Sequence, residues 1–506
     1  MKSKLKKYKS ILFLCLMFLG FMSCSSDSND ATEEETPITK TLTANISKID
    51  FVAKGEPVSV TIKTTVAAWT IASNVDWIQL SKTYGIKGSS LVLVTASENK
   101  TTVARTGIVT ISSSEAASVK ISVSQAAGTI VVVEGLYPSY NTNPIAADAS
   151  GMSSTAVQLA AKMKLGWNIG NSLEATGSDE TAWGNPKVTK QLIDLVKSKG
   201  FNAIRIPCAW NQYANNSTAL ISAAWLARVK EVVQYCVDNE MYVILNIHWD
   251  GGWLEEHCTE DKKEANNAKQ KAFWEQIATH LRDFDEHLLF ASANEPKVDN
   301  TTKMAVLTSY HQTFIDAVRS TGGKNANRNL IVQGPETDIG KTNNLMNTLP
   351  TDKVANRMMV EVHYYTPWAF AGLTKDESWG KMFYYWGADN HSATDTNRNP
   401  DWGEEAQVDA DFKLMKTKFI DKGIPVIMGE YGAIRRSDLT GDNLALHLKS
   451  RNYYLNYVTK QAKANGLIPF YWDEGSTTNN GFGIFDRKTN TVFDTQALNA
   501  IIEGMK

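Results

Sequence analysis

Cysteine is scarce and the charges nearly cancel in this chain of 506 residues. With Cys15 and Cys24 set aside in the N-terminal segment, three cysteines remain, an odd number that excludes a disulfide scaffold, and no Cys/His spacing typical of zinc sites occurs. Lysine and arginine number 52 against 54 acidic residues, a formal charge of −2, which supplies no field for holding nucleic acid. Hydrophobic residues make up 43% and charged residues 21%, which excludes a disordered chain.

A long hydrophobic run is also missing. Five lysines among the first nine residues precede the apolar residues 11–22, a run of 12, whereas a membrane-spanning helix takes about 20. Ser23-Cys24 follows at once and resembles a bacterial lipobox, in which the cysteine receives lipid. We predict a lipoprotein signal peptide over residues 1–23, lipid attachment at Cys24 and an acidic tether over residues 24–40. An ordinary signal peptide and an uncleaved anchor are the alternatives.

This N-terminal segment predicts export. Asp27 and Asp30 follow Cys24 closely and resemble the acidic signals that send some Gram-negative lipoproteins to the outer face of the outer membrane. We therefore expect an outer-membrane lipoprotein that is held by its N-terminal lipid and faces the cell surface.

Residues 41–128 predict a small all-β domain. Thr, Ser, Val and Ile alternate in short runs, and Gly and Asn turn signals separate these runs at intervals typical of a sandwich. The segments Trp69-Thr70-Ile71 and Asp76-Trp77-Ile78, with the closing residues 121–125, resemble the BACON module, an Ig-like sandwich of exported bacterial proteins. The module's name suggests carbohydrate binding. The alternative is a spacer with Trp69 and Trp77 in its core.

Beyond a predicted linker over residues 129–150, short apolar runs alternate with helical patterns. The apolar runs cover residues 164–167, 203–207, 241–247, 288–291, 330–332, 358–362, 425–428 and 467–471. Eight β–α units over residues 151–506 predict an α/β domain of the (β/α)8 TIM-barrel class. A doubly wound sheet, the rival fold, would usually carry a glycine-rich phosphate turn after its first strand, and this sequence has none.

Polar and aromatic residues stand where these strands end, which is where TIM barrels carry their chemistry. The residues at these positions are Arg205, His248, Asn294, Glu295, His363, Tyr365, Glu430 and Trp472. Among the strand ends there is no serine nucleophile elbow, no cluster of metal-type carboxylates and no lysine. Two carboxylates across a barrel mouth suit glycoside hydrolysis, in which one donates a proton to the leaving oxygen and the other attacks the anomeric carbon.

Residues 166–175 (GWNIGNSLEA) resemble the first-strand signature of glycoside hydrolase family 5, particularly its subfamily 4 of endoglucanases and xyloglucanases. The strand-end residues match that family's active-site pattern in order. The resemblance implies an endo-acting, retaining hydrolase of β-1,4-glucans that needs no cofactor and no metal. One departure is Glu474, where the subfamily often has asparagine.

The resemblance also implies roles for the strand-end residues. Glu295 would be the acid/base and Glu430 the nucleophile. The substrate-binding residues would be Arg205, His248, Asn294, His363, Tyr365 and Trp472. We expect Arg205 and Tyr365 to lie against Glu430 and to lower its pKa, because a nearby cation and a hydrogen-bond donor both favour the charged carboxylate.

The sequence thus predicts an enzyme whose partner is a β-glucan polysaccharide, with a preference for xyloglucan. A β-mannanase or xylanase with the same mechanism is one alternative, and a non-catalytic glycan-binding lipoprotein is another. Further sugar subsites are predicted at tryptophans in the loops after the strands. These are Trp183, Trp210, Trp249, Trp253 and Trp368.

Overall fold

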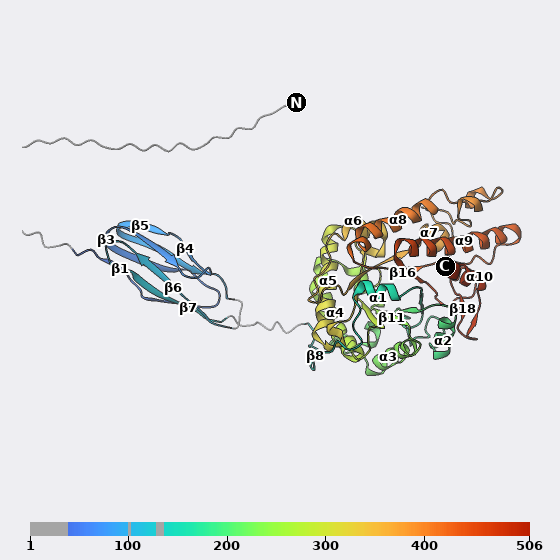
Figure 1. Ribbon diagram of the computed structural model, residues 1–506, viewed down its shortest axis with the longest axis horizontal. Helices are drawn as coiled ribbons and strands as arrows, with labels where there is room; N and C mark the ends of the chain where they lie inside the picture. Colours follow the sequence, from blue (N-terminus) through green and yellow to red (C-terminus); the bar gives the residue numbers. More distant parts are fainter. Residues whose placement is uncertain (1–38, 100–102, 128–135) are drawn as a thin grey trace, which may run out of the picture. The chain divides into compact units, whose positions relative to one another are not determined.

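The structure is a computed structural model that describes residues 39–99, 103–127 and 136–506. The chain forms two compact units, Met1–Val132 and Val133–Lys506, drawn in Figure 1 as a strand-rich part and a larger part of helices and strands. The predicted signal peptide and Cys24 lie outside the described residues. Within the described part, no helix is both long and apolar enough to cross a membrane.

The first unit is all-β, as the alternating sequence predicts. Its strands are β1 (Leu42–Ala44), β2 (Lys48–Phe51), β3 (Val58–Ser73), β4 (Ile78–Leu80), β5 (Tyr84–Ala96), β6 (Arg105–Ser112) and β7 (Val119–Gln125). They pair in the order β2-β7-β6-β3-β5-β4, and β1 also pairs with β3. Side chains alternate between the two faces of each strand, so every second residue enters a shared apolar core.

The two tryptophans of this unit belong to its interior. Trp69 is buried, and its indole N–H donates to the carbonyl of Ile86 at 3.2 Å. Trp77 is half-buried, and the guanidinium of Arg105 lies 4.6 Å from the centre of its ring. Neither ring is therefore presented as an open aromatic platform.

The second unit is built on a closed barrel of eight parallel strands. In barrel order these are β9 (Gly166–Asn168), β10 (Ala203–Ile206), β11 (Tyr242–Asn246), β12 (Leu288–Ala291), β14 (Leu330–Gln333), β15 (Met358–Tyr364), β16 (Val426–Tyr431) and β17 (Leu467–Tyr471), which closes on β9. Each of the eight predicted apolar runs overlaps one strand. The TIM-barrel prediction is confirmed.

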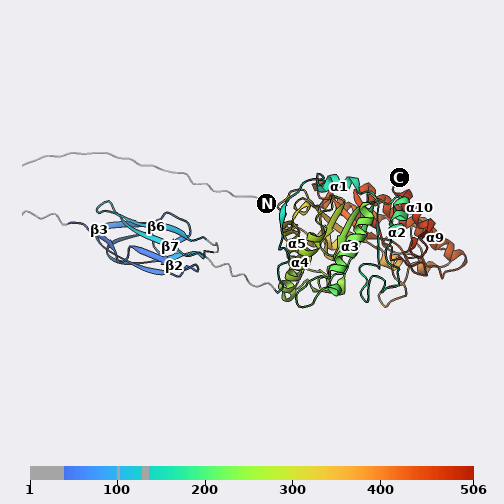
Figure 2. The same cartoon turned by 90° about the horizontal axis from the view of Figure 1, so that it is seen from below.

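Helices surround the barrel strands (Figures 1 and 2). The described helices are α1 (Ala156–Lys162), α2 (Lys190–Ser198), α3 (Ala223–Val237), α4 (Glu260–Leu281), α5 (Thr301–Ser320), α6 (Ile339–Leu345), α7 (Trp368–Ala371), α8 (Glu405–Lys418), α9 (Gly441–Asn465) and α10 (Thr495–Gly504). Trp225 on α3 and Trp274 on α4 are buried. Cys208, Cys236 and Cys258 are buried and free.

The predicted linker does not end where the sequence indicates. Strand β8 (Ile145–Ala147), inside it, pairs in parallel with the short β13 (Gly322–Gly323). The backbone N–H of Tyr140 donates to the buried carboxylate of Glu275 at 2.7 Å. Residues 136–150, the described part of the predicted linker, therefore pack on the barrel unit. Their backbone groups act as hydrogen-bond donors to a buried carboxylate, which lowers the cost of burying its charge.

Because residues 136–150 pack on the barrel unit, the stability of a truncated barrel should depend on whether they are kept. A chain beginning at residue 133 should keep the activity and melting temperature of the barrel. A chain beginning at residue 151 should unfold at a temperature several degrees lower, because removing partners from a buried charge costs about 1–3 kcal/mol. Thermal unfolding of both truncations tests this, and equal melting temperatures would show that residues 133–150 are a passive connector.

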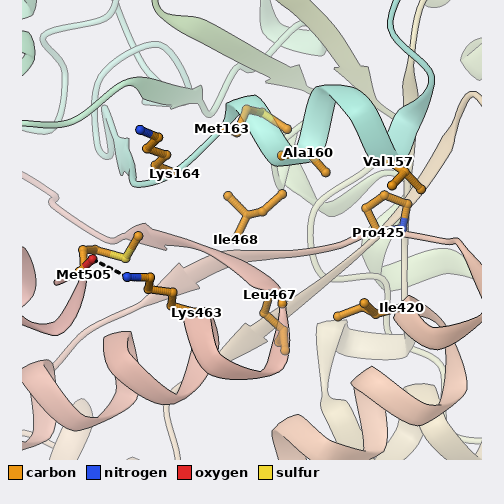
Figure 3. Close-up of a pocket in the computed structure, with 12 residues that line it drawn as sticks. Val157, Ala160, Met163, Lys164, Ile420, Pro425, Lys463, Leu467, Ile468 and Met505 are labelled. Carbon is orange, nitrogen blue, oxygen red and sulfur yellow. Dashed lines mark hydrogen bonds between the residues drawn. The ribbon is translucent and has the colours of Figure 1, made fainter.

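An apolar pocket lies at the amino-terminal end of the strands. It has a volume of about 540 Å³ and is lined by Met163, Pro425, Leu467 and Ile468, among others. Figure 3 shows α1 and strand β17 bordering it, and Lys463 donating to the carbonyl of Met505 at its rim. Leu467 is the first residue of β17, so this pocket is at the opposite end of the barrel from the polar strand ends.

Candidate active site

A polar layer lies above an apolar one inside the barrel. Ala203, Ile331 and Met359 belong to an apolar cluster inside the barrel. Two residues further along the same strands stand Arg205, Gln333 and Glu361, all fully buried. Because side chains of a strand alternate between its two faces, these polar groups also point inward, one step nearer the carboxyl ends of the strands. The sequence therefore builds the floor of a polar site directly on the barrel core.

Arg205 is the centre of this layer. Its Nη1 donates to Glu430 Oε1 at 2.7 Å and to Asn168 Oδ1 at 3.1 Å, and its Nη2 donates to Asn294 Oδ1 at 2.7 Å. Its Nε lies 2.8 Å from Glu361 Oε1. One planar guanidinium thus holds groups from β9, β15, β16 and the segment after β12 in a single arrangement, which only the fork geometry of arginine allows.

Glu430 is almost enclosed, with 7% of its side chain exposed. Besides the bond from Arg205, Tyr365 donates its hydroxyl to Oε2 at 2.9 Å, so both carboxylate oxygens have donors. Burial nevertheless raises the pKa of Glu430 above its usual value, and the opposing effects of His363 and Arg205 do not cancel it. The contacts predicted from the sequence are present, but the prediction of a lowered pKa is wrong because it left out desolvation.

Glu295 faces Glu430 and is much more open, with 44% of its side chain exposed. His363 lies between the two carboxylates: its Nδ1 is 2.7 Å from Glu295 Oε1 and 3.7 Å from Glu430 Oε2. One carboxylate oxygen of Glu295 and one of Glu430 lie within 4.8 Å of each other. The two carboxylates therefore differ in environment while standing close enough to act on one atom of a substrate.

His363 carries a proton through the neutral range. Burial alone would lower its pKa, but Glu430, Glu295 and Glu361 outweigh burial and raise the pKa of His363 to about 9. Its Nε2 lies 3.3 Å from Glu361 Oε1, so each ring nitrogen faces a carboxylate oxygen. Both nitrogens are donors in the protonated ring, and this arrangement matches that state.

Glu361 was missed by the sequence reasoning. It lies between Arg205 and His363, and Gln333 Nε2 donates to its second oxygen at 2.6 Å. It comes two residues before His363 in β15, so strand alternation alone could have placed it on the inward face beside that histidine.

Glu255 was missed as well. Its Oε1 accepts from the backbone N–H of Trp249 at 2.9 Å and from that of Glu295 at 3.1 Å. Burial, together with the nearby Glu295, raises the pKa of Glu255 to about 7. The Trp249 loop has left-handed backbone, with φ of 35° at Trp249 and 54° at Asp250, a conformation that costs energy and must be held by its surroundings. Glu255 thus ties this strained loop to the backbone of Glu295.

Trp472, which the sequence predicts as a sugar floor, lies against the ring of His248. The rings of Trp472 and His248 are parallel within 8°, with centres 5.9 Å apart. Asn246 Nδ2 lies 3.2 Å from His248 Nδ1 and fixes the ring. Burial, then Arg205 and His363, lowers the pKa of His248 well below 6.5, so this ring is neutral. A Cβ at Gly170 would lie 2.9 Å from the Trp472 ring, so glycine lets the first loop pass behind it.

The five predicted subsite tryptophans divide into two groups. Trp210 and Trp253 are buried and belong to the core, so their prediction as subsite residues is wrong. Trp183, Trp249 and Trp368 are 43%, 41% and 46% exposed. Trp379 and Trp402 are more exposed still, at 66% and 53%, and were not predicted because they lie in a long excursion after β15.

Two hollows are lined by predicted subsite residues or by residues of the site, and one of them includes Glu295. Trp183, Asn185 and Glu474 help to line one hollow of about 310 Å³. Glu295, Tyr365, Trp368 and Trp402 help to line the other, of about 420 Å³. Glu474, the departure noted in the sequence, accepts from the backbone N–H of Phe482 at 2.9 Å and so fixes the loop that follows β17.

Glu295, His363 and Glu430 form the one group among the described residues that could offer three ligand atoms to a metal ion. A cation is already provided there by Arg205, 2.7 Å from Glu430, and by the protonated His363. A divalent ion would be repelled by these two positive groups or would have to displace them, so the three residues do not suit a resident metal.

Comparison with known proteins agrees with this geometry. Residues 168–478 match the family model "Cellulase (glycosyl hydrolase family 5)", and residues 67–126 match that of the BACON domain. The xyloglucan-specific endo-beta-1,4-glucanase BoGH5A of Bacteroides ovatus is 36% identical over 516 residues, covering 98% of this chain and 96% of that protein. Endoglucanase A of Paenibacillus barcinonensis is 37% identical over 394 residues, covering 73% and 94%.

Solved structures give the same result. The Bacteroides ovatus GH5 xyloglucanase in complex with a XXXG heptasaccharide superposes with a TM-score of 0.68 at 36% identity, covering 92% of this chain and 99% of that one. The xyloglucan-specific glucanase XEG5B from a ruminal metagenomic library gives 0.65 at 39% identity, covering 70% and 96%. The chain therefore belongs to glycosyl hydrolase family 5, as a glycoside hydrolase with an N-terminal BACON domain.

Proposed function

We propose that this enzyme is a retaining endo-β-1,4-glucanase that prefers xyloglucan, with Glu295 as acid/base and Glu430 as nucleophile. The observation that carries the proposal is the pair of unlike carboxylates within 4.8 Å of each other. Retaining glycosidases hold their two carboxyl groups about 5–5.5 Å apart, whereas inverting enzymes need about 6.5–9.5 Å to admit a water. An approach of two oxygens this close suits the retaining separation better than the inverting one and favours direct attack by Glu430.

The first step uses the difference between the two carboxylates. Glu430 is ionised and held by Arg205 and Tyr365, and it attacks the anomeric carbon. Glu295 gives its proton to the departing glycosidic oxygen. His363 donates to Glu295 Oε1, which leaves Oε2 to carry that proton. The C–O bond to the leaving sugar breaks as the ester bond to Glu430 forms.

The second step returns the enzyme to its starting state. Glu295, now ionised, takes a proton from a water molecule, and the water oxygen attacks the same carbon. The ester breaks and Glu430 regains its charge beside Arg205. Glu295 can exchange protons with solvent because its side chain is 44% exposed, which suits a residue that must act as acid and then as base.

The hollow beside Glu295 supports cleavage inside a chain. Glu295 lines the hollow that contains Trp368 and Trp402, so the leaving part of the polymer is placed there. The other part of the polymer would then pack on the ring of Trp472. Flat apolar rings pack well on the C–H faces of sugars. A substrate that occupies both the hollow and the Trp472 ring is a polymer that is cut within its chain.

Xyloglucan preference is supported by the relatives. Both solved structures described above are of xyloglucan-active enzymes, and one of them matches almost the whole chain, including the BACON region. A branched glucan needs aromatic contacts in an open site, and Trp368 and Trp402, which line the hollow beside Glu295, are both exposed.

The test is a reducing-end assay over xyloglucan, carboxymethyl cellulose, mixed-linkage glucan, mannan and xylan. We expect xyloglucan to give the largest kcat/KM and mannan and xylan to give none. A larger kcat/KM on mannan or xylan would show that this polymer, and not xyloglucan, is the preferred substrate. Binding without hydrolysis of any polymer would make the protein a glycan-binding lipoprotein.

The rate should depend on pH in a bell shape. Because burial raises the pKa of Glu430, its ionisation, and with it the acid limb, should lie above pH 4.5. His248 is neutral and His363, with a pKa of about 9, is protonated, so neither should change charge between about pH 5 and 8. The alkaline limb should therefore reflect loss of the acid step rather than titration of a histidine.

The measurement is the pH profile of Glu295→Gln on an aryl glycoside whose leaving group needs no acid. Formation of the glycosyl-enzyme should persist, and its alkaline limb should vanish. An unchanged alkaline limb would assign it to another group.

We further propose that Cys24 carries lipid and holds the enzyme at the outer membrane, facing outward. The N-terminal sequence supports this, and the anchored enzyme would meet polymers too large to enter the cell. Fractionation of cells making the natural chain or Cys24→Ala tests it. The natural chain should be found in the outer membrane and be cleaved by external protease, and Cys24→Ala should be released from the membrane fraction.

A further inference from the structure

Glu361 is a buried carboxylate to which the mechanism above gives no role. Its side chain is fully enclosed in the middle of β15, beneath the two reacting carboxylates. A buried charge without a partner is strongly destabilising, so a carboxylate at this depth needs groups of opposite charge or hydrogen-bond donors around it. Two cations and one amide provide it here.

Two of the side chains that contact Glu361, Arg205 and His363, also contact the reacting carboxylates. Glu361 Oε1 lies 2.8 Å from Arg205 Nε and 3.3 Å from His363 Nε2. Its Oε2 accepts from Gln333 Nε2 at 2.6 Å, and Gln333 Oε1 in turn accepts from the backbone N–H of Ala293 at 2.8 Å. A Cβ at Gly429 would lie 2.0 Å from Glu361 Oε1, so the glycine before Glu430 makes room for the carboxylate.

Glu361 and Arg205 are held together by the attraction of their charges more than by an aligned hydrogen bond. The Nε of Arg205 makes no aligned hydrogen bond within the described residues, although it is 2.8 Å from the oxygen. An amide oxygen in the same place would have the same shape but no net charge. The attraction therefore depends on the ionised state of Glu361, and Arg205 keeps the pKa of that carboxylate below its usual value despite burial, which would raise it.

We infer that Glu361 is a positioning residue for the reaction: a permanent buried counter-ion that fixes Arg205 and His363 and keeps their charges balanced while Glu430 gains and loses its own. The inference rests on the proposed roles of Glu295 and Glu430.

The charge changes during the reaction give the reason. When Glu430 forms its ester, Arg205 loses one of its two carboxylate partners but stays fully buried. Glu361 takes no part in the chemistry and remains ionised, so Arg205 and His363 keep a partner in the intermediate. Without Glu361, Arg205 would act on Glu430 alone, would stabilise the free carboxylate and would oppose its conversion to an uncharged ester.

The titratable and charged groups around Glu361 come from four elements. They are Arg205 on β10, His363 on β15, Glu430 on β16 and Glu295 after β12, and β14 contributes the neutral Gln333. Removing one negative charge from this set should favour the ionised form of Glu430, so that it loses its proton at a lower pH.

The test is Glu361→Gln in the full mature enzyme, with kcat and KM measured across pH. We expect kcat to fall about a hundredfold while KM stays within about threefold, because misplacement of the reacting groups costs rate rather than binding. We also expect the acid limb to move to lower pH. A role in folding alone would leave the limb where it is.

The matched control is Glu286→Gln. Glu286 is a buried carboxylate of the same barrel that accepts from Ser154 and pairs with Lys162 at 2.6 Å, away from the strand ends. It should lower the melting temperature without moving either limb of the pH profile. The inference is overturned if Glu361→Gln keeps its kcat within threefold of the natural enzyme. It is also overturned if Glu361→Gln loses activity while its acid limb stays where it is in Glu286→Gln.

A second variant covers the case in which Glu361→Gln does not fold. The double change Glu361→Gln with Gln333→Glu exchanges carboxylate and amide across their hydrogen bond, so donor and acceptor stay matched and the buried charge is kept one residue further from Arg205. We expect it to fold and still to lose at least about tenfold in kcat. A natural rate would overturn the inference, whereas failure of the natural enzyme itself to hydrolyse any glucan would overturn the proposed function instead.

Discussion

Replacing Glu430 by alanine is expected to abolish hydrolysis, with kcat falling at least about 10⁴-fold. The variant removes the group that forms the covalent bond and opens a small space beside Arg205 and Tyr365, which both remain as donors. A small anion such as azide can enter that space. It should then attack the anomeric carbon from the side that Glu430 normally occupies.

The product distinguishes the roles of the two carboxylates. With an aryl β-glycoside that has an activated leaving group, azide should rescue Glu430→Ala and give the α-glycosyl azide. Glu295→Ala still forms the glycosyl-enzyme, so azide should instead give the β-glycosyl azide. Proton NMR of the products measures the configuration.

A nearby carboxylate serves as the control. Glu256 pairs with Lys297, two residues after Glu295, and takes no part in the site, so Glu256→Gln should keep full activity without azide. The same anomer from both alanine variants, or substantial hydrolysis by Glu430→Ala alone, would contradict the assignment of nucleophile and acid/base.

Replacing Arg205 by lysine should cost about 10²–10³-fold in kcat/KM although the charge is kept, because leaving a buried carboxylate without its partner costs about 3–5 kcal/mol. Arg205 serves Glu430, Glu361, Asn168 and Asn294 from three nitrogens of one plane. A lysine ammonium is a single point and cannot reach all four. Glu430 and Asn294, which lie on opposite sides of the site, should then lose their fixed separation.

Arg451→Lys provides the comparison. Arg451 is also buried and pairs with Asp494 at 2.6 Å, but it lies on α9 outside the strand ends. Both variants should unfold at lower temperature, and only Arg205→Lys should lose catalysis. Equal losses of activity from the two would show that the effect of Arg205→Lys comes from general instability.

Much of the fold and of the site could be predicted from the sequence. Eight apolar runs separated by helical patterns are enough to predict the barrel, because each strand is buried on both faces and leaves an unbroken apolar signature. Glu295 and Glu430 come shortly after the fourth and seventh of these runs. Their side chains are expected at the same edge of the barrel because parallel strands bring their carboxyl ends together there.

The sequence could not predict quantities that depend on how completely a group is enclosed. The pKa of Glu430 was expected to fall because its donors, Arg205 and Tyr365, can be identified from strand order, whereas desolvation depends on all the surrounding atoms. For the same reason the sequence could not separate the core tryptophans Trp210 and Trp253 from the exposed Trp183 and Trp249, which stand in similar loops.

What the sequence by itself determined is the order of the strands, the residues at their ends and the kind of chemistry that those residues can perform. Only the tertiary structure decided that Glu361 meets Arg205 and His363, that Glu255 holds the backbone of Glu295, and that the described part of the predicted linker packs on the barrel. The physical reason is that strand periodicity is local. The contact between Glu361 and Arg205, that between Glu255 and Glu295, and the packing of the linker each join segments tens to more than a hundred residues apart, and they exist only once the barrel has closed.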